Sequence, residues 1–269
     1  MNRQSVTRRV FSFAVLCVVS GLASAQIALG TAQNFGVLGG SAVTNTGPSI
    51  VQRDVGVSPG SSVTGFPPGL TSGVIHITDA AAGQGQVDLT TAYNAAAGSP
   101  CNVDLTGQDL GGLTLTPGVY CFSSSGFLTG TLTLDAQNNP DALFVFKTGS
   151  SLVTASASAV AYINTGGNSC ITTYWQVGSS ATLGTGSSFA GDILALFSIT
   201  LTTGAGTSGR TLARNGAVTL DSNVVGACNA TALPSAQARD IPTLDLRALV
   251  LLALLLAAAG ACISNRRKS

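Results

Sequence analysis

The sequence predicts a mainly β protein built from many short strands, with a single long helix. The run from Trp175 to Val225 is the clearest indication, because short alternations of apolar residues and threonine are separated by glycine and carry little charge. Ile199 and Leu201 alternate with threonine, and a period of two places this apolar pair on one face of a strand and the threonines on the other. One alanine-rich stretch departs from the pattern and predicts the helix.

Composition supports this fold class and excludes several functions. Only 9% of the 269 residues are charged, and glutamate is absent. Because a globular enzyme normally carries about 25% charged residues, we expect no enzyme. Disorder is the alternative for a Gly- and Ser-rich chain, but frequent Val, Ile, Leu and Phe supply enough apolar surface to fold. Residues 26–240 hold five Lys or Arg and ten Asp, so they lack the basic stripe that a nucleic-acid partner requires.

The N-terminus has the pattern of a secretory signal peptide. Arg3, Arg8 and Arg9 precede an apolar run over residues 10–23, and Ala23-Ser24-Ala25 is a small-x-small cleavage site. We therefore expect a signal helix within residues 1–25 and an exported domain over residues 26–230.

The C-terminus predicts a membrane segment. After a linker at 231–240, residues 246–263 are mostly Leu, Ala and Val, close to the roughly 20 residues that a transmembrane helix needs. The basic residues 266–268 follow and would stay in the cytoplasm, which leaves the main domain outside. A buried hydrophobic C-terminal helix is the alternative.

Strands and one helix are expected between these ends. Strands are predicted at 35–43, 54–57, 113–115, 118–122, 128–134, 142–146, 151–153 and 160–163, besides those within 175–225. A helix is predicted over about 78–98, with Thr78 as N-cap, Asp79 at the positive end of the helix dipole, and Gly98 before Ser99-Pro100 at its end. The strand spacing is irregular, so the pattern alone does not separate a sandwich from a solenoid.

Four cysteines in the exported region predict disulfides. An even number outside the cell is typical of disulfide bonding, and local order favours Cys101 with Cys121 and Cys170 with Cys228 among the three possible pairings. Metal binding is the alternative, but there is no C-x-x-C spacing and the only histidine, His76, is distant in sequence. We expect no metal and no other cofactor.

Five stretches of the chain point to a known family. They are LGTAQNF from Leu29, DVGVSPG from Asp54, DLTGQDL from Asp104, LTPGVY from Leu115 and ALFVF from Ala142. Their content and order resemble the DUF3494 ice-binding proteins over nearly all of residues 26–230. The resemblance implies an irregular right-handed β-solenoid of triangular section with one long α-helix packed alongside, and it agrees with the two local disulfides.

A second resemblance concerns residues 241–269. The tetrapeptide Ile241, Pro242, Thr243, Leu244, followed by the apolar segment and the basic tail, resembles the IPTL-type C-terminal sorting signal of Gram-negative bacteria. It implies delivery to the cell surface, with membrane anchoring until the tail is processed. Asp245-Leu246-Arg247 departs from the usual continuation, which puts cleavage in doubt.

The family resemblance implies a protein that adsorbs to an ice crystal surface through one flat, threonine-rich solenoid face and so limits ice growth or recrystallisation. We expect a monomer. Stacked strands would hold outward threonines about 4.8 Å apart between coils and about 6.7 Å apart along a strand. Threonine suits such a grid, because β-branching fixes its rotamer and its hydroxyl can take a water position. The candidate ice-binding residues are Thr44, Thr46, Thr182, Thr185, Thr200, Thr202, Thr219 and Asp221. A surface adhesin or structural module of the same fold, without ice affinity, is the alternative.

Possible catalytic motifs have structural interpretations. Gly56–Gly60 matches G-x-S-x-G, but Pro59-Gly60 predicts a turn where a nucleophile elbow needs a helix. His76 lies in a strand-like Ile-His-Ile context, where a structural role is expected. Asp104 and Asp109 are expected to form Asx-turns in Gly-rich loops. The arginines of RTLAR (210–214) are expected in an internal ion pair with Asp192 or Asp221.

Overall fold

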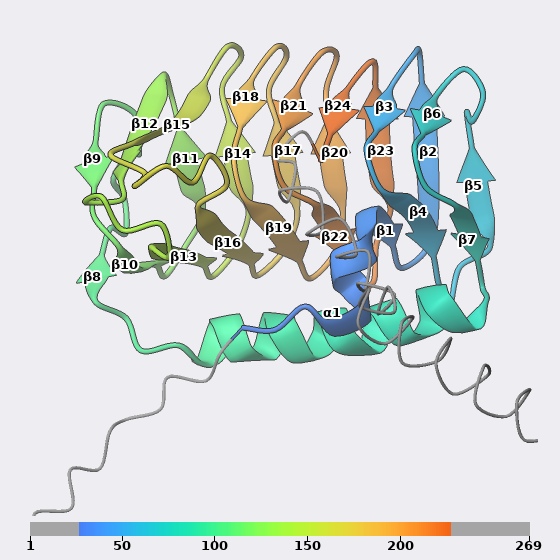
Figure 1. The fold of residues 1–269 in the computed structure, drawn as a ribbon, viewed down its shortest axis with the longest axis horizontal. Helices are drawn as coiled ribbons and strands as arrows, with labels where there is room; N and C mark the ends of the chain where they lie inside the picture. The colour runs from blue at the N-terminus through green and yellow to red at the C-terminus, as the bar shows by residue number, and fades with distance from the viewer. Residues whose placement is uncertain (1–26, 227–269) are drawn as a thin grey trace, which may run out of the picture.

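The computed structural model describes residues 27–226, and these form three parallel β-sheets and one α-helix (Figure 1). The predicted signal peptide, Cys228, the linker, the sorting motif and the transmembrane segment lie outside the described residues. Within residues 27–226, no helix combines the length and the apolar character that crossing a membrane requires.

Each sheet contains one strand from most coils of the chain. Sheet A holds, in spatial order, β7 (Ile75–Ile77), β4 (Asp54–Val57), β1 (Phe35–Gly39), β22 (Thr211–Ala213), β19 (Asp192–Ala195), β16 (Thr172–Val177), β13 (Leu143–Thr148), β10 (Gly118–Phe122) and β8 (Val103–Asp104). Sheet B holds β11 (Gly126–Leu128), β14 (Leu152–Thr154), β17 (Ala181–Leu183), β20 (Ile199–Leu201), β23 (Val218–Asp221), β2 (Ala42–Thr46) and β5 (Ser62–Thr64). Sheet C holds β6 (Leu70–Thr71), β3 (Ile50–Val51), β24 (Val224–Val225), β21 (Gly206–Thr207), β18 (Ser188–Phe189), β15 (Ala159–Ile163), β12 (Thr131–Asp135) and β9 (Thr114–Leu115).

The coils are not stacked in the order of the sequence. The coil β1–β2–β3 lies against the last coil, β22–β23–β24, with Val43 paired to Val218 and Ile50 paired to Val224. The chain then forms the coil β4–β5–β6, crosses to the far end of the molecule through helix α1, and winds back coil by coil. Figure 1 shows the blue N-terminal strands next to the orange C-terminal ones. The N-terminal and C-terminal halves are therefore joined by hydrogen bonds in all three sheets.

Helix α1 (Ala80–Gly98) lies along the outer face of sheet A. Its N-cap is Asp79, whose side chain accepts a hydrogen bond from the Ala82 N–H at 2.9 Å. The prediction that Thr78 caps the helix is wrong. Thr78 precedes the N-cap by one residue and has a left-handed backbone, with φ of 51°, whereas the N-cap Asp79 is extended. Leu89 and Ala92 are fully buried in a second core shared with Phe35 and Leu38 of β1 and with β16, β19 and β22.

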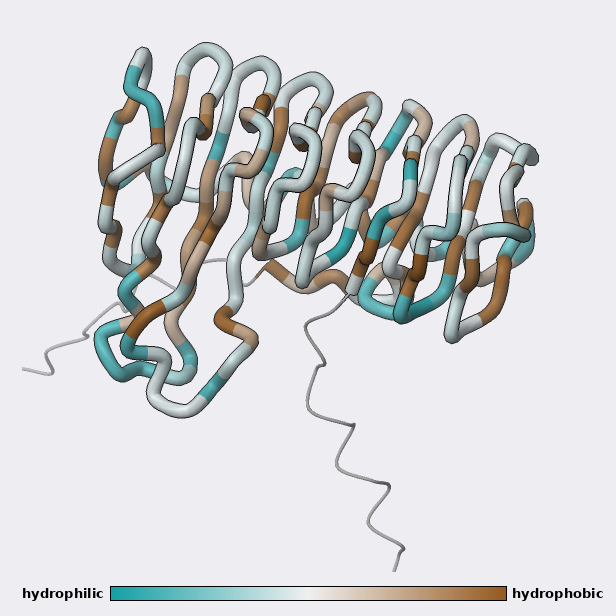
Figure 2. The backbone as a smooth tube through the Cα atoms, turned by 90° about the horizontal axis from the view of Figure 1, so that it is seen from above, coloured by the Kyte–Doolittle hydropathy of each residue, from teal (hydrophilic) through white to brown (hydrophobic). Residues whose placement is uncertain are grey.

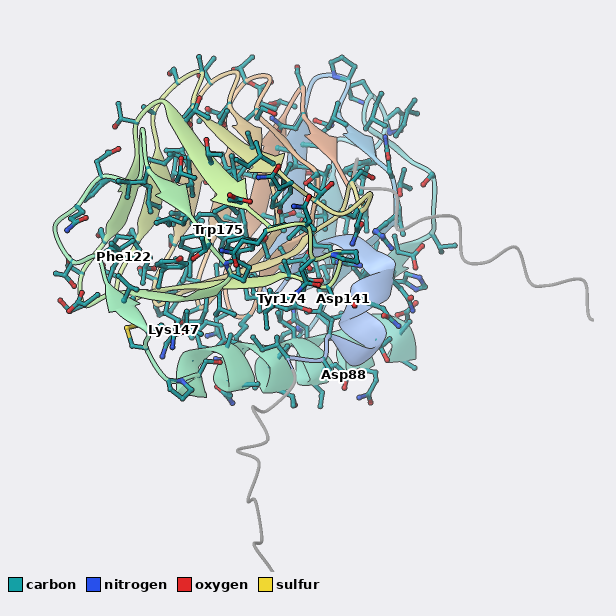
Figure 3. All side chains as sticks on the ribbon, turned by 60° about the vertical axis from the view of Figure 1, so that its left-hand side comes forward. Asp88, Phe122, Asp141, Lys147, Tyr174 and Trp175 are labelled. Atoms are coloured by element: carbon teal, nitrogen blue, oxygen red, sulfur yellow. A yellow bond between two sulfur atoms is a disulfide. The ribbon has the colours of Figure 1, made fainter. Side chains whose placement is uncertain are left out.

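The far end of the helix is fixed to sheet A by two contacts. Cys101 and Cys121 form the predicted disulfide. Lys147 Nζ donates a hydrogen bond to the carbonyl of Ser99, the C-cap residue, at 2.7 Å. Figure 3 shows Lys147 and the disulfide near this end of the helix. Burial lowers the pKa of Lys147, which is partly enclosed here.

The main core lies between the three sheets and is built from the inward residues of every coil. Tyr120, Phe146 and Trp175 stack on one another with ring centroids 5.3 and 3.9 Å apart, and Phe189 lies tilted against Trp175 at 4.8 Å. Trp175 Nε1 donates to the Ala190 carbonyl at 2.9 Å, so its one polar atom is satisfied. Figure 2 shows short hydrophobic stretches recurring in successive coils.

Two predicted strands are each divided by a corner. The run 35–43 forms β1 and the start of β2, separated by Gly40 and Ser41, whose N–H groups both donate to the Gly216 carbonyl. The run 128–134 falls on β11 and β12, separated at Gly130 with φ of 86°. Apolar alternation continues through such corners, so it predicts the strands without marking where the chain turns from one sheet to the next.

Candidate functional site

Sheet B carries an unbroken row of five threonines, which we call the threonine ladder. The register pairs Thr182 with Thr200, Thr200 with Thr219, Thr219 with Thr44, and Thr44 with Thr64. The residues on either side of each ladder threonine in β17, β20 and β23 are buried. The ladder therefore points away from the core, as the alternation at 199–202 predicts.

Thr64 is a member of the ladder that the sequence pattern did not predict. It lies on β5, the last strand of sheet B, and pairs directly with Thr44. Ser62 and Thr64 flank Val63, which packs against the core, so the same alternation was present in a three-residue segment. A run this short between turn residues is easily taken for a loop.

The ladder hydroxyls are largely free to bind water. The Thr44 hydroxyl donates to that of Thr219 at 3.3 Å. Across residues 27–226, the hydroxyls of Thr182, Thr200 and Thr64 have no hydrogen-bond partner. Neighbouring strands hold these groups about 4.8 Å apart, and β-branching keeps each side chain in a narrow set of rotamers. The result is a regular row of threonine side chains, each with one methyl and one hydroxyl group, on the outer side of sheet B.

The other four predicted residues lie beside the ladder, toward the corner with sheet C. Thr202 donates to the Leu183 carbonyl at 2.8 Å, and Thr46 donates to the Leu220 carbonyl at 3.3 Å. The Asp221 carboxylate accepts from the Thr203 hydroxyl, and the Thr185 hydroxyl is 3.3 Å from that of Thr202. These groups bond to the protein itself and hold the corner together.

The row changes character toward the other end of sheet B. The position of Thr182 is taken by Val153 in β14 and by Phe127 in β11, and Asp109 forms the next bridge. Partial burial acts to raise the pKa of Asp109, but hydrogen bonds from the Gly111 and Thr129 N–H groups outweigh it and hold this pKa below its ordinary value. Asp109 thus forms the Asx-turn predicted for it.

Neither of the other sheets presents a comparable surface. The outer face of sheet A packs against α1 and the segment around η1 (Gly30–Asn34). On sheet C the corresponding outward row is mixed in size and chemistry: Thr131, Ala159, Ser188, Gly206, Val224, Ile50 and Leu70.

The groups that resemble catalytic residues are engaged in structure. After Ser58 the chain turns and enters β5 instead of a helix, so there is no nucleophile elbow. His76 Nδ1 lies 2.7 Å from the N-cap carboxylate of Asp79. Asp104 accepts from the Thr106 N–H at 2.9 Å, the predicted Asx-turn. In the part of the chain that the structure describes, no three His, Cys, Asp or Glu residues are grouped as metal ligands.

A cleft of about 410 Å³ lies on sheet A beside η1 and is lined by several polar side chains. Arg210 and Asp192 form the predicted ion pair there at 2.8 Å. Burial raises the pKa of Tyr162 and of Tyr174 to about 12, so both phenols are neutral at physiological pH. Cys170 also lines this cleft, and its predicted partner Cys228 lies outside the described residues.

Comparison with known proteins identifies the family of this chain. The model of the ice-binding-like family matches residues 37–226, which span the described solenoid from β1 to its last coil. The chain belongs to the ice-binding-like family. A relative in this family, the ice-binding protein of Nostoc sp. (strain HG1), is 61% identical over 198 residues, covering 73% of this chain and 72% of the relative.

Solved ice-binding structures have the same fold. An ice-binding protein from an Antarctic biological consortium superposes with a TM-score of 0.70 at 48% identity, over 74% of this chain and 90% of that one. The ice-binding protein of the Antarctic ascomycete Antarctomyces psychrotrophicus superposes with a TM-score of 0.69 at 40% identity, over 74% of this chain and 96% of that one. Both solved chains consist almost entirely of the shared region, so this solenoid folds as an independent unit in these ice-binding-like relatives.

Proposed function

We propose that this chain adsorbs to ice through the threonine ladder of sheet B and thereby limits ice growth or recrystallisation. The relatives and solved structures above bear the name of ice-binding proteins, which supports the activity. The observation that carries the choice of face is the register of five outward threonines. Within the described residues, the hydroxyls of Thr64, Thr182 and Thr200 have no hydrogen-bond partner, and those of Thr44 and Thr219 bond to each other. We infer adsorption without catalysis, cofactor or metal.

The mechanism follows from the regularity of the ladder. Each threonine methyl orders the water next to it, and each free hydroxyl can occupy a water position. Because the ladder is fixed by the parallel hydrogen bonds of sheet B, this water is held in a regular row before contact. Such a layer can join the ice lattice without a further loss of side-chain conformational entropy.

The test is an ice-recrystallisation assay on residues 26–230, the region that folds independently in relatives. We expect the wild type to keep crystals small. Thr200→Tyr places a large ring in the middle of the ladder and should abolish most of the inhibition. Thr131→Tyr places the same ring on the outward row of sheet C and should leave the inhibition intact.

Two results separate the possible errors in this proposal, and a folding control accompanies them. A folded wild type without inhibition would reject ice binding. Full activity in Thr200→Tyr with loss in Thr131→Tyr would move the site to sheet C. Circular dichroism and the melting temperature of each variant exclude unfolding as the cause of a loss.

We also propose that the protein is exported as a monomer to the surface of a Gram-negative cell. The support is the signal-peptide pattern of residues 1–25, the sorting motif Ile241–Leu244, and the apolar segment 246–263 with its basic tail. Cell fractionation with an antibody to the solenoid should find this domain at the cell surface. Recovery only from the cytoplasm would reject export.

A further inference from the structure

The outward row of sheet B runs through all eight coils, yet only five of them carry threonine. From the edge strand β5 the row reads Thr64, Thr44, Thr219, Thr200 and Thr182. It then continues with Val153, Phe127 and Asp109, each in register with the residue before it. The strands of sheet B thus continue beyond the threonines, so the extent of the flat surface depends on the shape of the side chains.

Val153 preserves the shape of the ladder. Valine and threonine share a β-branched outline, with a methyl group in place of the hydroxyl, so both stand at the same height above the sheet. Val153 is 36% exposed and pairs directly with Thr182. A surface resting on the threonine methyl groups therefore meets a matching methyl group at Val153.

Phe127 breaks this shape. Side chains in a strand stand roughly perpendicular to the sheet, so a phenylalanine ring reaches well beyond the Cγ atoms of its branched neighbours. Phe127 is 49% exposed, so half of its surface projects into solvent. Next to it, the Asp109 carboxylate accepts from the Thr129 hydroxyl at 2.8 Å and carries a charge, whose hydration differs from that of the uncharged ladder.

We propose that Phe127 ends the ice contact, which therefore covers six coils, from Thr64 on β5 to Val153 on β14. The projecting ring holds a flat crystal plane away from β11 and from Asp109 beyond it. This inference rests on the proposed ice-binding function of sheet B. It makes Phe127 a determinant of the contact area and hence of the strength of the activity.

The experiment measures thermal hysteresis, the gap between melting and freezing temperatures, at equal molar concentrations of residues 26–230 and its variants. Phe127→Thr and Phe127→Val both remove the ring and restore the height of the row, so each should raise the hysteresis above that of the wild type. Val153→Tyr places a ring inside the proposed contact and should lower it strongly. Thr131→Tyr places a ring on the outward row of sheet C, outside the contact, and serves as the control with unchanged hysteresis.

Each contrary result overturns a definite part of the proposal. No rise in Phe127→Thr would show that the ring does not limit the contact. A rise in hysteresis in Phe127→Thr without a rise in Phe127→Val would show that the missing hydroxyl, and not the ring, limits the ice contact. Full activity in Val153→Tyr would show that the contact ends at Thr182 and does not include Val153. Thr200→Tyr, measured in parallel, separates these failures from that of the function, because its full activity would reject sheet B altogether.

Discussion

At the scale of single residues, threonine has two different roles in this protein, and hydrogen bonding separates them. Thr182 and Thr200 have hydroxyls without a partner in the described chain and face solvent from the middle of strands. Thr211 is fully buried and donates to the Gly36 carbonyl at 3.3 Å, while Thr202 bonds to a corner carbonyl. Threonine in this chain therefore serves both as an outward surface residue and as an internal hydrogen-bond donor, and Thr182 and Thr200 are of the first kind.

Asp192 and Arg210 form a largely buried ion pair in the cleft on sheet A. The Asp192 side chain is 12% exposed and that of Arg210 is 17% exposed. Asp192 Oδ1 also accepts from the Arg210 backbone N–H at 2.9 Å, and Arg210 Nε donates to the Gln33 carbonyl at 3.0 Å. The pair thus connects two neighbouring coils with η1.

We predict that Asp192→Ala lowers the free energy of unfolding by about 3 kcal/mol, because it leaves a largely buried guanidinium without its counter-charge. Urea unfolding followed by tryptophan fluorescence measures this change. Asp192→Leu combined with Arg210→Met removes both charges and should recover most of the loss. A loss below about 0.5 kcal/mol would place the pair with weak surface ion pairs.

At the scale of elements, helix α1 contains two interior glycines with opposite surroundings. At Gly83, the nearest atom that an added Cβ would meet is the Ser58 hydroxyl oxygen at 4.0 Å. At Gly85, an added Cβ would lie 2.9 Å from the ring of Phe35. On its other side the same ring lies 2.5 Å from the Cβ position of Gly56, so it has no room to move away. Gly85 is therefore needed for close packing of the helix on sheet A, whereas Gly83 is not.

We predict that Gly83→Ala raises the free energy of unfolding by about 0.5 to 1 kcal/mol, because alanine favours the helix over glycine by that amount. Gly85→Ala gains the same propensity but forces α1 away from β1, and it should lower stability overall. Thermal unfolding of the two variants, which differ only in position, measures the contrast. Equal stabilisation by both would contradict the close packing seen at Phe35.

The elements also show how much of this fold the sequence could predict. Strands and their inward faces were predictable where alternation extends over several residues, as at Ile199 and Leu201. The short strand β5 and its Thr64 were missed, because three residues between turns give too little pattern. The helix N-cap was misplaced by one residue, since both Thr78 and Asp79 are favourable capping residues and only the backbone conformation separates them.

At the scale of the whole molecule, the order of the coils decides the functional surface. Thr44 and Thr219 are adjacent in the ladder although 175 residues separate them in the chain. No periodicity within the sequence encodes this neighbourhood, which arises because the N-terminal coil stacks on the last one. The ladder could therefore be predicted as a set of outward threonines, whereas its continuity required the register between distant strands.

The chain contains no glutamate, so its acid stability depends largely on aspartates distributed over the solenoid. Besides Asp109, three of them have a pKa below the ordinary 3.8 because they accept hydrogen bonds: Asp79 chiefly from the Ala82 N–H, Asp88 chiefly from the Thr31 N–H, and Asp104 chiefly from the Thr106 hydroxyl. They fix the start of α1, the attachment of η1 to α1, and the loop after β8. Figure 3 shows Asp88 beside η1.

Because each pKa is lower in the folded state than in the unfolded state, the stabilisation is complete well above pH 3.8 and is lost as pH falls through the folded values. We therefore predict that titration of these aspartates does not change the melting temperature between pH 8 and about 5. Below about pH 4 the melting temperature should fall steeply. Scanning calorimetry measures the profile. Asp79→Asn retains an N-cap acceptor but cannot titrate, so its acid limb should be shallower. A steep fall already between pH 7 and 5 would contradict the prediction, because protonation of these aspartates lies below that range.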